Sequence, residues 1–218
     1  SAAIEITPEV NSASTVSTSP ENRAAVSPGF CAESVAAMRR AKFDAVNATC
    51  EITPHHALLC DMDMEDDGRF KMNPPLRDGA DKSALIEAMQ DGTIDVIATD
   101  HAPHTEKEKG GGLRGSAMGV VGLETAFSTL YTGLVLKKKL SLERLLEMMS
   151  VAPARIIGRR HDIEAGCPAD ITLLDLGAEY EIDPADFKSM GRSTPFAGAR
   201  VRGRVVRTIF NGRTVFAL

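Results

Sequence analysis

The segment Ile94–Thr99 is apolar apart from Asp95 and Thr99, and it leads directly into Asp100-His101-Ala102-Pro103-His104. A run of this kind is typical of a parallel strand that is buried on both faces. An acid placed immediately after such a strand projects from the strand's C-terminal end, where ligands bind in parallel α/β folds. The segment therefore predicts an α/β chain with Asp100 at a ligand-binding edge.

Helix and strand signals alternate around this segment. Glu33–Lys42 and Asp81–Gln90 carry apolar residues at helical spacing, and Gly92 closes the second. Asn47–Thr53 is predicted to be a strand that ends before Pro54. Further helices are predicted from Leu123 to Leu134, from Ser141 to Met149 and from Pro153 to Gly158. This βαβα order implies a mostly parallel sheet.

The two ends of the chain follow different patterns. Residues 1–32 are rich in Ser, Thr, Pro, Asn and Ala and contain neither Lys nor His, so we expect them to be irregular. Beyond residue 160, a strand is predicted over Asp170–Asp175. A hairpin joins Arg204–Phe210 to Arg213–Ala217 through Asn211-Gly212. Residues 161–218 are therefore predicted to form a small β subdomain.

Composition excludes several classes of partner. The formal net charge of −5 gives no sign of nucleic-acid binding. The four cysteines form no CxxC pair, which argues against a disulfide framework and fits a reducing compartment. The sequence also contains no apolar run of membrane-spanning length and no signal-peptide pattern. We therefore expect a soluble, cytoplasmic protein without a membrane or nucleic-acid partner.

The residue types after Ile94–Thr99 leave two interpretations open. Asp100, His101 and His104 together could ligate zinc or move protons. Alternatively, Asp100 caps a turn and the histidines pack on the surface. Spacing alone does not decide between the functional and the structural interpretation.

Several stretches resemble dihydroorotases of the amidohydrolase superfamily over about residues 33–218. Asp100–His104 and Asn73-Pro74-Pro75-Leu76-Arg77 separate this resemblance from hydantoinases and allantoinases, and Gly119–Ala126 agrees with it. Further stretches agree as well: Cys50–His56, Ala152–Arg155, Gly166–Asp170 and Ser193–Gly198. The resemblance implies part of a (β/α)₈ TIM-type barrel over residues 33–160, namely its last two strands with their helices.

The resemblance also implies an activity and the residues that carry it. Dihydroorotases interconvert dihydroorotate and N-carbamoyl-L-aspartate in pyrimidine biosynthesis, using a hydroxide held by zinc. Asp100 matches the family's metal ligand that also accepts and returns a proton. Asn73 and His104 match positions that hold the substrate carboxylate, and Met118 and Gly119 match a backbone contact to the ring amide. The glycines at 110–112 fit a mobile loop beside the site.

His55 and His56 invite a second metal hypothesis. If they lie on a strand, adjacent side chains point to opposite faces, so both are not expected to bind one metal. A structural role at the strand end is favoured for the pair. One type of dihydroorotase uses the glutamate that matches Glu51 for an additional zinc, and this alternative ranks lower.

The chain also departs from the family pattern. The family has a His-x-His, a bridging lysine carbamate or carboxylate, two further histidines and a substrate-binding arginine. None has a counterpart, since no His precedes His55 and no Lys precedes Lys42. We therefore predict that the chain alone is nearly inactive. Three explanations account for the missing ligands: a truncated enzyme, one piece of a split enzyme, or a non-catalytic scaffold that binds aspartate transcarbamoylase. Truncation is favoured. Exposed strand edges would also permit a homodimer.

Overall fold

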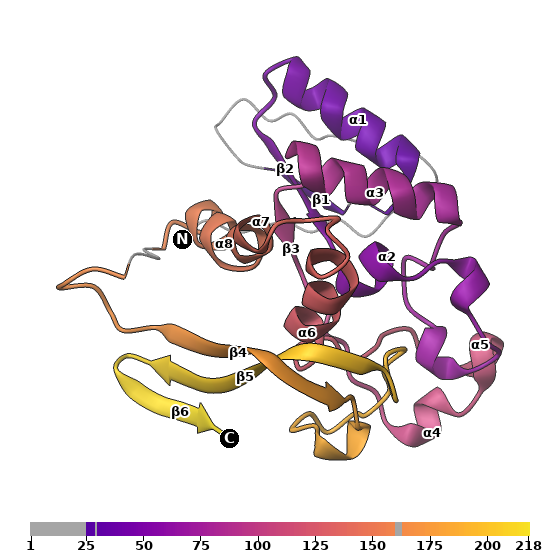
Figure 1. The fold of residues 1–218 in the computed structure, drawn as a ribbon. Helices are drawn as coiled ribbons and strands as arrows, with labels where there is room; N and C mark the ends of the chain where they lie inside the picture. The colour runs from indigo at the N-terminus through magenta and orange to yellow at the C-terminus, as the bar shows by residue number, and fades with distance from the viewer. Residues whose placement is uncertain (1–24, 29, 160–162) are drawn as a thin grey trace.

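The computed structural model describes residues 25–28, 30–159 and 163–218, which form a mixed α/β structure (Figure 1). None of the helices in these ranges has the length and apolar content that a membrane crossing needs. The elements are β1 Ala25–Pro28, α1 Ala32–Phe43, β2 Ala48–Ile52, α2 Pro54–Leu58, η1 Asp61–Asp63, η2 Gly68–Phe70, α3 Gly79–Asp91, β3 Val96–Ile97, α4 Glu106–Lys109, α5 Gly112–Gly115, α6 Ala126–Leu130, η3 Tyr131–Val135, α7 Leu142–Leu146, η4 Glu147–Val151, α8 Ala152–Ile156, β4 Ile171–Glu181, η5 Pro184–Asp186, β5 Arg200–Phe210 and β6 Arg213–Ala217.

A parallel sheet of order β1-β2-β3 positions the candidate site. The two strands predicted from the sequence are β2 and β3, and β1 is an additional strand, paired with β2 from Ala25↔Ala48 to Pro28↔Glu51. The prediction that residues 1–32 are irregular is therefore wrong for Ala25–Pro28, because backbone pairing with β2 orders a segment without a local strand pattern. Residues 1–24 lie outside the described part.

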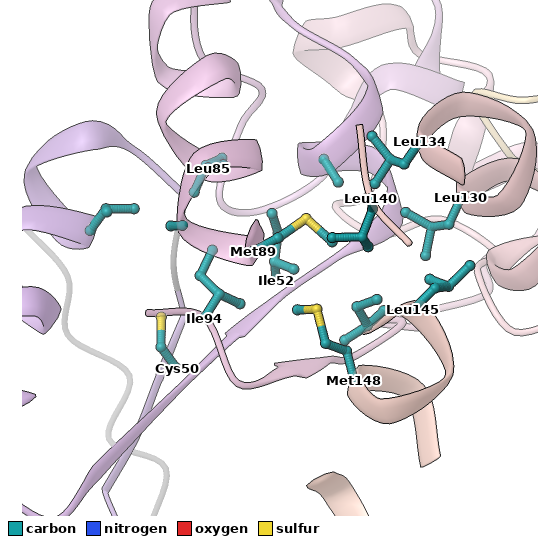
Figure 2. Close-up of a cluster of buried hydrophobic side chains, with 14 of the residues drawn as sticks. Cys50, Ile52, Leu85, Met89, Ile94, Leu130, Leu134, Leu140, Leu145 and Met148 are labelled. Atoms are coloured by element: carbon teal, nitrogen blue, oxygen red, sulfur yellow. The ribbon is translucent and has the colours of Figure 1, made fainter. Parts of the chain in front are cut away.

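The main core lies between the parallel sheet and the helices around it. Ile52 of β2, Ile94 before β3 and Leu85 of α3 are each no more than 1% exposed, and they meet Leu130 and Leu145 from α6 and α7 (Figure 2). Full burial of an aliphatic side chain of this size stabilises the folded state by about 1.5–3 kcal/mol. The apolar faces predicted for these segments are therefore the faces that pack.

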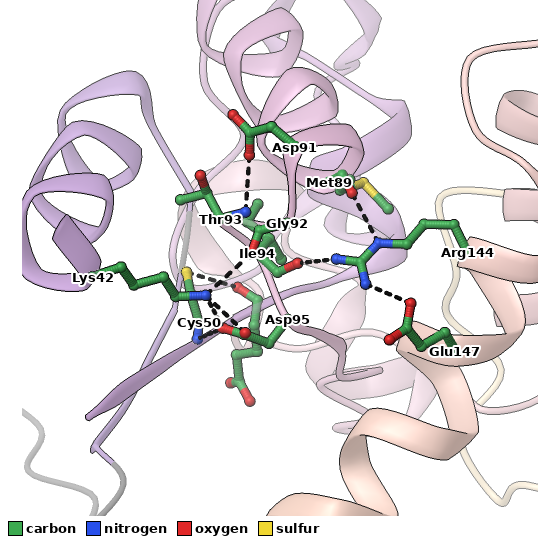
Figure 3. Close-up of polar contacts among 11 residues, drawn as sticks. Lys42, Cys50, Met89, Asp91, Gly92, Thr93, Ile94, Asp95, Arg144 and Glu147 are labelled. Carbon is green, nitrogen blue, oxygen red and sulfur yellow. Dashed lines mark hydrogen bonds and ion pairs between the residues drawn. The ribbon is translucent and has the colours of Figure 1, made fainter. Parts of the chain in front are cut away.

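Asp95, the one acid inside the predicted strand, anchors β3 to its neighbours. Its carboxylate accepts hydrogen bonds from the Lys42 ammonium at 2.7 and 2.8 Å and from the Cys50 backbone N–H at 2.7 Å (Figure 3). On the other side, Arg144 of α7 donates to the carbonyls of Met89 and Ile94 at 3.1 and 2.8 Å. These charge-assisted bonds hold the entry to β3 between two helices.

The helices match the sequence pattern at most of their ends. Ser141 caps α7 by accepting from the Arg144 N–H, and Gly92 ends α3 with φ 83°. One prediction needs correction, because Leu123 is exposed and precedes α6. The short helix predicted at Pro153 is found as α8, which has Pro153 in its first turn and continues directly from α7 and the π-helical η4.

The C-terminal region forms an antiparallel sheet of order β4-β5-β6 that packs against α6 and η3 (Figure 1). Asn211 and Gly212 both have positive φ, at 48° and 74°, as a tight hairpin turn requires. Gly203 of β5 has φ 87°, and a Cβ there would lie 2.8 Å from the Tyr131 ring. The close approach of β5 to the helix therefore requires glycine at this position.

Candidate functional site

Asp100 stands at the C-terminal edge of the parallel sheet, two residues beyond the last backbone bond of β3 to β2, from Ala98 N–H to the Ile52 carbonyl. Its side chain is exposed, and its φ is 47°, in the left-handed region that aspartate tolerates better than most residues. A residue held there turns the chain sharply out of the sheet. The predicted position of Asp100 at a strand end is therefore found.

The negative charge of Asp100 acts on two ionisable side chains, Glu51 of β2 and His56 of α2. Burial raises the pKa of the Glu51 carboxyl, and the negative charge of Asp100 raises it further. Burial lowers the pKa of His56, and Asp100 partly opposes that effect. Asp100 therefore affects the ionisation of both groups.

His56 is committed to structural hydrogen bonds. Its Nε2 lies 3.0 Å from the Pro74 carbonyl, which only accepts, so Nε2 carries the hydrogen. Nδ1 then accepts from the Thr53 hydroxyl at 2.7 Å. The pair His55-His56 lies on helix α2, which Thr53 caps, and so the premise that the two residues lie on a strand is wrong. With both ring nitrogens occupied, His56 is no free metal ligand in this arrangement.

The His55 side chain is buried, and one of its ring nitrogens lacks a hydrogen-bond partner among the described residues. The side chain is 2% exposed, and the nitrogen without a partner in the described part of the chain is Nε2. Burial, with a smaller contribution from neighbouring His56, lowers the pKa of His55 to about 3. The imidazole is therefore neutral near pH 7.

We expect the chain to lose stability as the pH falls below 6.5, the ordinary pKa of histidine, toward about 3. In this window the unfolded chain binds a proton at His55 and the folded chain does not, so acid favours unfolding. Between pH 7 and pH 5 the loss from His55 is about 2 kcal/mol. Urea unfolding of the wild type and His55→Gln at both pH values measures it. His56 titrates in both proteins, so its contribution cancels when the two are compared. The test is the difference between wild type and His55→Gln in how much the free energy of unfolding falls from pH 7 to pH 5. An equal fall in both proteins would contradict the prediction.

His104, Met118 and Gly119 are brought together by the structure. His104 Nε2 donates to the Met118 carbonyl at 2.8 Å. A Cβ on Gly119, whose φ is 132°, would lie 3.2 Å from the His104 ring and 2.6 Å from Ala102 Cβ. His104 Nδ1 lies 3.8 Å from Glu108 Oε2. Of the four predicted substrate-binding residues, these three therefore form one contact group.

Asn73 follows a residue, Lys71, whose backbone contacts this group. Gly119 N–H donates to the Lys71 carbonyl at 3.0 Å, and Asn73 is exposed two residues further on. The next residue, Pro74, supplies the carbonyl that His56 binds. The segment with Asn73 thus lies between the loop at Gly119 and the helix at the end of β2.

His101 has a structural role that the sequence left open. Its Nδ1 accepts from the backbone N–H groups of Gly122 and Leu123 at 3.2 and 3.3 Å. Its Nε2 lies 3.4 Å from the Ser189 hydroxyl, which donates to Glu124 at 2.7 Å. His101 therefore ties the strand end to the C-terminal region.

The structure also adds Lys109 to the site, a residue that sequence reasoning missed. It lies in the run Glu106-Lys107-Glu108-Lys109, which indicates a solvated helical turn and gives no signal that one lysine is buried. The neighbouring glycines at 110–112, predicted to form a mobile loop, lead into the short helix α5. There Leu113 N–H donates to Asp66 at 2.9 Å.

The described residues do not by themselves make a metal site. Within residues 25–28, 30–159 and 163–218, no three His, Cys, Asp or Glu side chains are grouped to hold an ion. Asp100 offers a carboxylate, but His56 is occupied. A structural zinc site needs about four ligands and a catalytic one about three.

The amidohydrolase family model matches residues 63–215, more than half of the chain. The chain belongs to the amidohydrolase family. The family and the solved structures below imply a TIM-barrel-type fold. Members of this family are generally metal-dependent.

Curated relatives of this amidohydrolase are dihydroorotases. The protein from Lactiplantibacillus plantarum is 48% identical over 188 residues and the one from Halalkalibacterium halodurans 50% over 186 residues, covering 85% and 84% of the chain. The chain spans 44% of the length of each. The resemblance to dihydroorotases predicted from the motifs is confirmed.

Solved structures of hydantoinases have a similar fold. The L-hydantoinase (dihydropyrimidinase) from Arthrobacter aurescens superposes with a TM-score of 0.81 at 28% identity, covering 88% of this chain and 44% of that one. The D-hydantoinase (dihydropyrimidinase) from a Thermus species also has a TM-score of 0.81, at 23% identity, and covers 89% and 45%.

Proposed function

We propose that this amidohydrolase chain is part of a dihydroorotase, which opens and closes the dihydroorotate ring. The observation that carries the proposal is a contrast in sequence identity at similar coverage of the chain. Identity is 48–50% to dihydroorotases but 28% to a hydantoinase of the same fold. The Asp-His-Ala-Pro-His and Asn-Pro-Pro-Leu-Arg motifs favour the same substrate class.

The proposed roles use the positions of the side chains at the sheet edge. Asp100 is the proton-transfer group and one metal ligand, because its carboxylate is exposed at the strand end. Alongside burial, the negative charge of Asp100 raises the pKa of Glu51, and a bound cation would relieve this repulsion. Asn73 and His104 are the proposed carboxylate-binding groups. Since His104 Nε2 already donates to the Met118 carbonyl, it would have to release that carbonyl to donate to a substrate carboxylate.

The backbone at Met118 and Gly119 is the proposed contact to the ring amide. Gly119 N–H is already donated to Lys71, and both carbonyls already accept one hydrogen bond. Each carbonyl oxygen retains a second lone pair, which can accept from a ring N–H. The carbonyl groups, and not the Gly119 N–H, are therefore the proposed contact atoms.

We further propose that β1, β2 and β3 are the last strands of an incomplete (β/α)₈ barrel and that zinc is the metal. The remaining ligands would come from polypeptide outside the described residues, since these residues supply too few. The small-molecule substrates are dihydroorotate and N-carbamoyl-L-aspartate. The cytoplasmic location, the homodimer and the aspartate transcarbamoylase complex stay predictions.

A chimera tests the function. This chain replaces the matching 44% of the Lactiplantibacillus plantarum dihydroorotase, and ring opening is assayed with dihydroorotate and with hydantoin. We expect the zinc-loaded chimera to open dihydroorotate and not hydantoin, and we expect the chain alone to do neither. A folded chimera that prefers hydantoin would overturn the substrate assignment. Turnover by the chain alone would overturn the proposal that its site is incomplete.

A further inference from the structure

Lys109 is a buried cation at the end of the short helix α4. Its residue exposure is 7%, whereas Lys107 on the same turn is exposed. No carboxylate forms an ion pair with Lys109 among the described residues, although its neighbours Glu106 and Glu108 are both acidic. An ammonium buried without a counter-charge costs free energy unless its three N–H groups are all bound.

The ammonium of Lys109 meets three backbone carbonyls. Its Nζ donates to the carbonyls of Gly119 at 2.7 Å, Ala117 at 2.8 Å and Lys71 at 3.0 Å. A charged amine has three N–H donors and no acceptor, so these carbonyls match it one to one. Burial lowers the pKa of Lys109, the nearby charge of Lys71 lowers it further, and the negative charge of Asp67 partly opposes both. Lys109 is therefore bound specifically by these three carbonyls and is not a solvated surface lysine.

The three carbonyls belong to the two segments that carry the candidate substrate-binding residues. Ala117 and Gly119 flank Met118, whose carbonyl His104 binds. Lys71 precedes Asn73 by two residues, and its carbonyl also accepts the Gly119 N–H. One side chain thus joins the backbone on both sides of the proposed carboxylate and ring-amide contacts.

Hydrogen bonds at both ends of α4 hold the backbone from which the Lys109 side chain extends. Thr105, next to His104, caps the helix, and the Glu108 carboxylate accepts from the Thr105 backbone N–H at 2.9 Å. The Lys109 carbonyl accepts from the Ser116 hydroxyl at 2.8 Å. The side chain therefore extends from a held backbone into the loop that it binds.

We propose that Lys109 is a positioning residue that sets the distance between the Lys71–Asn73 segment and the Ala117–Gly119 loop. The inference that this distance controls substrate affinity rests on the proposed function. The structural part, that the ammonium orders the loop, does not. Lys109 itself touches backbone carbonyls and is not assigned a catalytic role.

Amide hydrogen exchange in the complete chain tests the structural part. Lys109→Met keeps most of the side-chain volume and removes the donors, and Lys107→Met is the matched control on the exposed side of the same helix. We expect exchange in peptides covering Gly119 to rise about tenfold or more in Lys109→Met, with exchange in β2 and α3 unchanged. Lys107→Met should behave as wild type. Unchanged exchange at Gly119 would overturn the proposal.

Should Lys109→Met not fold, the wild-type chain still gives a decisive measurement. In ¹⁵N-lysine spectra, the Lys109 ammonium is expected to exchange slowly with water and to show couplings to the carbonyl carbons of Lys71, Ala117 and Gly119. A freely exchanging ammonium without such couplings would overturn the proposal that Lys109 binds these three carbonyls.

Kinetics in the chimera test the functional part. Lys109→Met is expected to raise KM for dihydroorotate about tenfold or more and to change kcat by less than about threefold, as expected for lost binding geometry. A fall in kcat of about tenfold with unchanged KM would contradict the proposal that Lys109 positions substrate-binding groups. An inactive parent chimera would overturn the proposed function, while the exchange result would still decide the role of Lys109 in the loop.

Discussion

Asp100→Asn is expected to lower kcat for dihydroorotate in the chimera by about 10²–10⁴-fold, the range for loss of a general acid–base group. Asparagine is nearly the same size and tolerates the left-handed backbone, so the observed φ of 47° is retained. The amide cannot accept and return the proton, and it is a weaker ligand for a cation than a carboxylate. Steady-state kinetics with dihydroorotate measure the effect.

Asp95→Asn is the matched control for Asp100→Asn. Asp95 lies five residues earlier and binds Lys42 and the Cys50 N–H, away from the proposed substrate contacts. This variant should lose stability in urea unfolding and retain its activity where it is folded. If Asp100→Asn instead retained more than about a tenth of the parent kcat, Asp100 would not be the proton-transfer group.

Gly119→Ala is expected to destabilise the chain by about 2–5 kcal/mol, combining backbone strain with overpacking. The φ of 132° is one that L-residues rarely adopt, and the new Cβ would lie 2.6 Å from Ala102 Cβ and 2.8 Å from the Ala102 carbonyl. The backbone must therefore shift, and it carries the carbonyls of Met118 and Gly119 with it. Urea unfolding of the chain measures the loss, and KM for dihydroorotate in the chimera should rise as well.

Gly158→Ala separates the clash from the strain. Gly158 also has positive φ, at 68°, but a Cβ there has no heavy atom within 4 Å. Only the left-handed backbone cost of about 1–2 kcal/mol applies. Equal losses in the two variants would show that close packing around Gly119 contributes nothing.

The sequence determined the elements whose signals are local. Ser141 and Gly92 mark helix ends because capping uses neighbouring backbone groups, and Asn211-Gly212 adopts the positive φ values that a tight hairpin needs. The apolar run after Ile94 predicted a buried strand, and Asp100 does follow it at the sheet edge. The motifs at Asn73 and Asp100 also pointed to the family that the comparisons confirm.

The tertiary structure alone decided the features that depend on distant partners. Strand β1 forms because β2 offers backbone partners. Lys107 and Lys109 occupy equivalent positions in an alternating charged run, yet only Lys109 is buried, because Lys71, Ala117 and Gly119 converge on it. Hydrogen bonds between segments far apart in sequence leave no trace in local pattern. The local sequence therefore predicted the strand ends and turns, while the arrangement of the candidate site depends on which backbone groups meet.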